Sequence, residues 1–213
     1  MKYFDCRAPE RWHPPAKGNR LRKLTYYLAT SVDGFIADPD GDGDFFNKWL
    51  DPEYSGAMFA EFPETVPTHV QAALGLDPGA PRRFDAIVMG RGTYDPAYDV
   101  GITSPYAHLD QYVASRSLTE SPDPAVEIIS GDVAARVREL KARPGLGIYL
   151  CGGADLAGQL VEEIDEFVVK TYPVFVGSGI PMSRAGFALR ELELTDVRSF
   201  TGGQVVTTYA RRR

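Results

Sequence analysis

The stretch "IYLCGGADLAGQLVEE", residues 148–163, decides how this chain folds. A short apolar run ends at a pair of glycines, Gly152 and Gly153, and a helical pattern follows in which Leu156 and Leu160 lie one turn apart. A buried strand that turns directly into an amphipathic helix is the repeating unit of an α/β fold with a parallel sheet. Glycines at the start of such a helix also let an anion approach the backbone N–H groups.

The same alternation of strands and helices extends along the chain. Asp132 is placed to cap a helix in which Val133, Val137 and Leu140 fall on one face. The two terminal strands are joined through a Gly202–Gly203 turn, which is typical of an antiparallel hairpin. Strands are expected over 24–30, 86–89, 111–115, 126–130, 147–152, 166–177, 189–200 and 204–212, and helices over 53–62, 132–143 and 154–164. This pattern predicts an α/β fold with a central mixed, largely parallel sheet flanked by helices and a C-terminal antiparallel hairpin.

Length and composition indicate one globular domain, because the chain has 213 residues, of which 44% are apolar and 24% charged. The net charge of -6 argues against binding to nucleic acid, which requires a basic face. Neither a long apolar run nor a signal-peptide core is present, so we expect a cytoplasmic protein with no membrane segment. Residues 1–23 are basic and rich in proline, and we expect an extension there and a single domain over 24–213.

The sequence predicts no metal site, although "SVDGFIADPDGDGDFF", residues 31–46, begins like a calcium-binding EF-hand loop. The twelfth position counted from Asp38 is Trp49, whose indole cannot replace the bidentate Glu that completes such a site. The cysteines and histidines are too scattered for a disulfide framework or a zinc pattern. The stretch is therefore interpreted either as a plain turn cluster or as a loop that covers a pocket.

Two further segments that follow predicted strands carry groups suited to phosphate. "VMGRGTYDP" provides Gly90, Arg91, Gly92 and Thr93 at a turn into a helix, and "ASRSL" places Arg116 between two hydroxyls. Each segment alone is equally well explained as a tight turn or a surface loop. Together with the Gly152–Gly153 turn they favour a dinucleotide whose phosphates lie over two helices, and the arginine suits the 2′-phosphate that distinguishes NADPH from NADH.

These segments resemble, in order and approximate spacing, the dihydrofolate-reductase-like reductases, and most of all the C-terminal reductase domain of the bifunctional riboflavin-biosynthesis deaminase-reductase and its stand-alone relatives. The resemblance covers about residues 24–210 and rests on "YYLATSVDGFIAD", "DAIVMGRGTYDP", "YVASRSL", "IYLCGGADLAGQLVEE" and "DEFVVKTYPVFVGSGIPM". It implies a dihydrofolate-reductase-like fold that holds NADPH across the strand ends, with the loop over 31–46 as a lid. Ala29 and Ile36 would flank the nicotinamide. The other cofactor-binding residues expected are Gly90, Arg91, Gly92, Thr93, Ser115, Arg116, Ser117, Cys151, Gly152, Gly153, Ala154 and Asp155.

The chain also departs from the family's pattern. Riboflavin reductases commonly have a Lys after the Asp-Gly of the first loop and a Glu before the Gly-Gly pair, where this chain has Phe35 and Cys151. A ribityl-phosphate pyrimidine is therefore a poor substrate candidate, and no carboxylate is clearly placed to bind a folate.

We expect an NADPH-dependent oxidoreductase that reduces a C=N or C=O bond of a small molecule. Asp33, or a water that it positions, would supply the proton, although Asp-Gly is also an ordinary turn dipeptide. The aromatic residues expected to line the substrate pocket are Phe45, Phe46, Trp49 and Tyr94. The alternative is a non-catalytic sensor or scaffold that binds a pyridine nucleotide. By family habit, a homodimer is expected.

Overall fold

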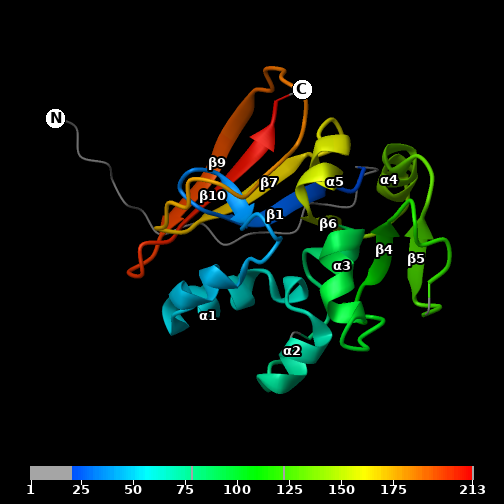
Figure 1. Ribbon diagram of the computed structural model, residues 1–213, viewed down its shortest axis with the longest axis horizontal. Coiled ribbons are helices and arrows are strands. Elements are labelled where there is room, and N and C mark those ends of the chain that lie inside the picture. The colour runs from blue at the N-terminus through cyan, green and yellow to red at the C-terminus, as the bar shows by residue number, and fades with distance from the viewer. Residues whose placement is uncertain (1–20, 78, 122, 213) are drawn as a thin grey trace.

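An eight-stranded mixed sheet forms the centre of the computed structural model, which describes residues 21–77, 79–121 and 123–212 (Figure 1). The strand order is β5-β4-β3-β6-β1-β7-β10-β9; neighbours are parallel from β5 to β7, and β10 and β9 are antiparallel additions. The strands are β1 (Leu24–Thr30), β3 (Phe84–Gly90), β4 (Asp110–Ala114), β5 (Val126–Ile129), β6 (Gly147–Gly152), β7 (Glu166–Thr171), β9 (Leu192–Ser199) and β10 (Val205–Arg211). The predicted α/β class, the largely parallel sheet and the C-terminal hairpin are confirmed.

Helices cover the two faces of the sheet in separate layers (Figure 1). One layer holds α4 (Val133–Ala142) and α5 (Ala154–Gln159), whose apolar residues pack on the sheet around Leu150. The opposite layer is built from the 3-10 helices η1 (Asp44–Trp49) and η2 (Pro63–Thr65) and the helices α1 (Pro52–Glu61), α2 (Thr68–Ala73) and α3 (Arg91–Tyr98). Between the layers the side chains of β3 from Ala86 to Met89 are fully buried, as expected of a strand covered on both faces.

Local hydrogen bonds explain where two of the helices begin. The Asp132 carboxylate accepts from the Ala135 N–H at 2.9 Å and caps α4, as the sequence predicts, and Asp51 caps α1 in the same way.

At the other end of α4, Lys141 is buried and forms an ion pair with Asp165 at 2.6 Å. This pair fastens the end of α4 to the start of β7.

Two predicted elements are longer than the elements observed. The strand predicted over 166–177 ends at Thr171, because Pro173 has no N–H to continue the ladder and disfavours further regular structure before it. The helix predicted over 154–164 ends at Gln159, where a tight turn with a Glu163 N–H to Leu160 carbonyl bond of 2.8 Å leads into β7. Both predictions were wrong at their C-terminal boundaries.

A small second sheet, which the sequence pattern did not indicate, joins β2 (Phe35–Ala37) to β8 (Ile180–Pro181). It connects the loop after β1 to the chain beyond β7. The predicted basic extension lies, up to residue 20, outside the described residues. Within the described residues, no helix combines the length and apolar character that a bilayer crossing needs.

Candidate functional site

The two glycine-rich turns predicted to bind a cofactor lie against each other at the carboxyl ends of β3 and β6. These strands are neighbours, and Met89 pairs with Gly152. A Cβ on Gly90 would lie 3.4 Å from the Gly152 carbonyl oxygen, and a Cβ on Gly153 would lie 3.9 Å from the Thr93 hydroxyl oxygen. The three glycines and Thr93 meet through backbone and one small side chain, and no large side chain stands between the two turns.

The start of α3 has no capping side chain, unlike the starts of α1 and α4. Its N-cap is Gly90, which offers no side-chain acceptor, whereas Asp51 and Asp132 cap the other two helices. A Cβ built on Gly92 would meet nothing within 4 Å, so the space beside the first turn is open. The N–H groups there have no side-chain partner. They point out of the N-terminal end of the helix, where the helix dipole favours an anion.

The loop after β4 adds cationic and hydroxyl groups to the same edge. The buried Ser115 hydroxyl accepts from the Ser117 N–H at 3.2 Å and so shapes the loop. Arg91 forms an ion pair with Asp95 and donates to the Ser117 hydroxyl at 3.3 Å, which links the start of α3 to this loop. Arg116 is exposed and makes no hydrogen bond or ion pair within the described part of the chain. Arg116 is therefore available to a ligand.

Asp33, the predicted proton donor, is used to hold two loops together. Its carboxylate accepts from the Gly177 N–H at 2.8 Å and from the Val176 N–H at 3.3 Å. Partial desolvation would raise the pKa of Asp33, but hydrogen bonds from the Ser31 hydroxyl and from these backbone groups outweigh it and lower the pKa. Asp33 is thus ionised at neutral pH and has no proton of its own to donate there.

Two aspartates of the loop over 31–46, Asp38 and Asp42, accept hydrogen bonds from nearby backbone groups of the loop. Asp38 accepts from the N–H groups of Asp40 and Asp42 at 2.9 Å each, and Asp42 accepts from the Asp44 N–H at 2.7 Å. These are Asx turns, for which the Asp- and Gly-rich sequence is sufficient explanation. Among the described residues, no group of three or more His, Cys, Asp and Glu side chains is arranged to hold a metal ion.

Three of the four aromatic residues predicted to line a substrate pocket form one group. The rings of Phe45 and Phe46 lie 4.2 Å apart, and Tyr172 lies 4.7 Å from Phe46 and 6.4 Å from Trp49. Phe45 and Trp49 are partly exposed. Tyr94 is fully buried instead, and its hydroxyl donates to the Thr103 carbonyl at 2.6 Å, so its placement is that of a core residue.

The remaining predicted site residues occupy the ends of β1, β2, β6 and α5. Ala29 and Ile36 are partly exposed, and they pack against opposite core layers. Ala154 is buried at the start of α5, while the exposed Asp155 lies 3.2 Å from Arg184. Cys151 points into the sheet layer that contains the aromatic group, and burial raises the pKa of its thiol.

Lys170 is the group at this edge that the sequence reasoning missed. It is the penultimate residue of β7 and pairs with Ala29 of β1, and its ammonium lies 3.9 Å from the centre of the Tyr27 ring. Burial lowers its pKa to about 8. The signal was present in the strand, because Val168, Lys170 and Tyr172 alternate onto one face and a lysine there interrupts a buried apolar row.

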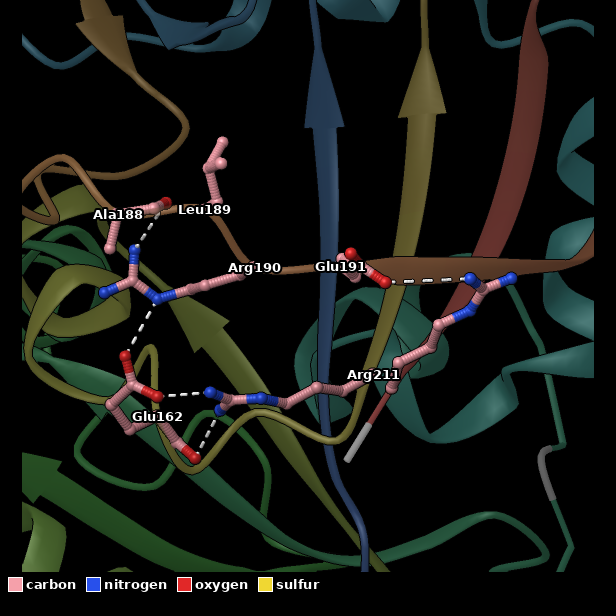
Figure 2. A pocket seen from close by; sticks show the side chains of 7 residues that line it. Glu162, Ala188, Leu189, Arg190, Glu191 and Arg211 are labelled. Carbon is pink, nitrogen blue, oxygen red and sulfur yellow. Dashed lines mark hydrogen bonds and ion pairs between the residues drawn. The ribbon is translucent and has the colours of Figure 1, made fainter.

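Two open hollows on the surface lie away from the glycine turns. A hollow of about 380 Å³ is bordered by Glu162, Arg190 and Arg211, whose charges are paired with one another (Figure 2). It adjoins the start of β7, since the Arg211 N–H bonds the Asp165 carbonyl. A second hollow, of about 460 Å³, lies beside the start of β4. Both are at the end of the sheet opposite the glycine turns, where α/β folds do not bind their ligands.

Comparison with known proteins identifies the family of this chain. Residues 22–208 match the family described as the RibD C-terminal domain. The chain belongs to this family. The uncharacterized protein YwjB of Bacillus subtilis (strain 168) is 32% identical over 190 residues, covering 87% of this chain and 95% of YwjB. A second uncharacterized protein of that strain, YyaP, is 25% identical over 203 residues, covering 89% of this chain and 95% of YyaP.

Solved structures share the fold of this RibD C-terminal domain. A protein from Shewanella sp. PV-4 described as a riboflavin biosynthesis protein has a TM-score of 0.66 and 25% identity, over 90% of this chain and 99% of its own. Dihydrofolate reductase from Enterococcus faecalis, complexed with NADP(H), has a TM-score of 0.61 and 12% identity, over 90% of this chain and 97% of its own. A deaminase/reductase from Thermotoga maritima has a TM-score of 0.60 and 15% identity, over 90% of this chain and 57% of its own. The predicted dihydrofolate-reductase-like fold and family are confirmed.

Proposed function

We propose that this RibD C-terminal domain is an NADPH-dependent reductase that transfers hydride to a C=N or C=O bond of a small molecule. The observation that carries the proposal is the pairing of two uncapped glycine turns at the ends of β3 and β6, beside the unpartnered Arg116. Backbone N–H groups at such an edge suit a pyrophosphate, and an exposed guanidinium suits a phosphate monoester. The family and the fold neighbours, which include reductases, support the same class of reaction.

The residues present fit the cofactor. The open space at Gly92 and the backbone of Gly152 and Gly153 would receive the phosphates. Arg116, with Arg91 and the Ser117 hydroxyl beside it, would hold the 2′-phosphate. Ala29 and Ile36 would flank the nicotinamide, which supplies the hydride when the cofactor is bound. The remaining cofactor-binding residues are proposed with the roles predicted from the sequence.

The proton that accompanies hydride is proposed to come from water near Asp33. The lowered pKa of Asp33 leaves its carboxylate ionised at neutral pH, and its two backbone donors fix its position. Such a carboxylate can orient a water but has no proton to release itself. Of the two roles predicted for Asp33, positioning a water is therefore favoured.

A non-catalytic nucleotide-binding protein is the second candidate, and one feature favours it. The thiol of Cys151, at the position before the Gly-Gly pair, accepts a hydrogen bond from the Tyr149 hydroxyl at 3.1 Å and shares one with the Tyr106 hydroxyl at 3.9 Å. The Phe35 side chain belongs to the small β2–β8 sheet. Neither position supplies an acid or base to a reacting ring.

We also propose that the chain works as a homodimer in the cytoplasm. The β9 strand leaves apolar side chains exposed, with Leu194 at 53% and Val197 at 55%, and the nearby Phe187 is almost fully exposed. Apolar side chains gathered at a sheet edge are typical of an association surface. Light scattering of the wild type and of a Leu194→Asp variant tests the dimer, since the charged variant should be monomeric.

A fluorescence titration followed by a turnover screen tests the proposed activity. NADPH should bind more tightly than NADH, and at least one carbonyl or imine metabolite in a panel should then cause its oxidation. Binding without any turnover would favour the non-catalytic alternative. Absence of NADPH binding would reject both.

A further inference from the structure

Lys170, which is partly exposed, differs from the buried Lys141 in having no counter-charge among the described residues. Lys141 forms an ion pair with Asp165 at 2.6 Å and donates to the Glu163 carbonyl at 2.9 Å. Lys170 forms no hydrogen bond and no ion pair with any described residue; its ammonium lies over the Tyr27 ring face, 3.9 Å from the ring centre. A buried charge is ordinarily paired, because removing it from water is costly. An ammonium left without a partner is therefore suited to a ligand that supplies one.

Two groups from neighbouring strands face Lys170, and neither carries a negative charge at neutral pH. From β6, the Cys151 thiol is its electrostatic neighbour, and burial raises the pKa of that thiol, which keeps it neutral. From β1, the Tyr27 phenol lies beneath it. Tyr27 also interacts electrostatically with Glu61 and Arg198. No described carboxylate is paired with Lys170, so its charge is left without a counter-ion.

Aromatic side chains lie beside Lys170 along the same face of the sheet. Tyr172, two residues further along the chain, contacts both Phe46 and Trp49, and the rings of Phe45 and Trp49 are partly exposed. Lys170 is also partly exposed, so a molecule can reach it from the same side as these rings. Flat apolar surfaces next to one cation are complementary to a planar anion.

We propose that Lys170 is a substrate-recognition group, and that the substrate is a planar organic anion whose carboxylate or enolate oxygen accepts from the Lys170 ammonium while its ring lies against the partly exposed Phe45 and Trp49. This inference specifies the substrate class of the proposed reductase. It rests on that proposed function, because the bound anion is a substrate only for an enzyme. The binding itself depends only on Lys170 and its surroundings. Because Ala29, the predicted neighbour of the nicotinamide, pairs with Lys170, an anion bound there would lie next to the reacting ring.

Three aromatic probes of nearly equal shape test the charge preference on the intact protein. Benzoate, benzamide and benzylamine are titrated by calorimetry at pH 7, with and without saturating NADPH. Benzoate should bind about tenfold more tightly than benzamide, because a charged acceptor strengthens the hydrogen bond, and benzylamine should bind least. Equal affinities of the wild type for benzoate and benzamide would overturn the inference, whatever the behaviour of any variant.

Three variants locate the effect. Lys170→Met should reduce benzoate affinity to that of benzamide, and Lys170→Arg should keep most of the preference. Lys48→Met tests the alternative cation, because the exposed Lys48 lies over the Trp49 ring at 5.2 Å and could attract an anion to the same rings. If Lys48→Met and not Lys170→Met abolishes the preference, the inference is wrong. The NADPH titration of the same samples is a separate readout, so loss of cofactor binding with retained benzoate binding would reject the reductase and not the anion site.

Discussion

Replacing Lys170 by methionine should stabilise the protein at neutral pH, although it removes a contact. Burial lowers the pKa of Lys170 from 10.5 to about 8, which at about 1.4 kcal/mol per pKa unit corresponds to about 3 kcal/mol against the charged form. Solvent at its partly exposed end reduces this to about 2 kcal/mol. Methionine keeps an apolar contact with the Tyr27 ring and so replaces part of the cation–π attraction. A net gain of about 1 to 2 kcal/mol is expected.

The gain should depend on pH with a defined sign. Below pH 8 Lys170 is protonated in both the folded and unfolded states, so the folded state bears the whole cost of the buried charge. Between pH 8 and 10.5 the folded state loses its proton first, and the cost disappears as pH rises. The advantage of Lys170→Met over the wild type should therefore be largest at pH 7 and shrink toward pH 10. Repeating the series with Cys151→Ala checks that the coupled thiol is not responsible.

Urea unfolding at pH 7, 8.5 and 10 measures the effect, supported by thermal melts in which about 2 to 8 °C of stabilisation is expected at pH 7. Lys141→Met is the matched comparison, because it removes one partner of a buried ion pair and should destabilise by about 3 kcal/mol. If Lys170→Met were destabilised at pH 7 to a similar extent, Lys170 would have a stabilising partner in the fold. The description of Lys170 as an unpaired cation would then be refuted.

Three further predictions concern the cofactor edge. Arg116→Ala should weaken NADPH about ten- to a hundredfold and leave NADH nearly unchanged in fluorescence titrations, because a charge-assisted bond to the 2′-phosphate is lost; equal weakening of both nucleotides would remove Arg116 from that role. Gly153→Val should abolish tight NADPH binding because the valine would occupy the space proposed for the phosphates, and the protein should stay folded because a side chain there meets only Thr93, at 3.9 Å. Gly131→Val, where the space is equally open, is the control; undiminished affinity of Gly153→Val would place the phosphates elsewhere. NADPH at a hundredfold excess over Kd should slow amide exchange across residues 31–46 by up to about 2.7 kcal/mol in opening free energy, whereas calcium should have no effect; protection by calcium alone would restore the EF-hand interpretation of this loop.

Most of the fold could be predicted because its signals are local. The apolar run from Ala86 to Met89, the Asp132 cap with its apolar helical face, and the glycine hairpin turn each specify an element within a few residues. The glycine turns could likewise be assigned to one edge, since the carboxyl ends of parallel strands lie together. The strand directions alone place the two turns at one edge, without knowledge of their contact through Gly90 and Gly153.

The features that the sequence did not predict depend on partners distant in sequence. The small β2–β8 sheet joins segments about 140 residues apart, and neither is long enough to show a period. The hydrogen bonds that Asp33 accepts could not be predicted, because the backbone donors at Val176 and Gly177 come from another loop. The lysine in β7 was visible in the sequence, but its lack of a counter-charge is a property of the assembled core.

The polar groups without partners at this edge contrast with similar groups that the fold satisfies. Asp caps complete the starts of α1 and α4, yet α3 begins at Gly90 without one. Lys141 is paired, yet Lys170 is not. The uncapped helix, Arg116 and Lys170 all belong to the carboxyl ends of β3, β4 and β7 in a single sheet. A stable fold gains nothing from leaving these groups unsatisfied, so their concentration at one edge is better explained by a ligand with several negative charges than by the requirements of folding.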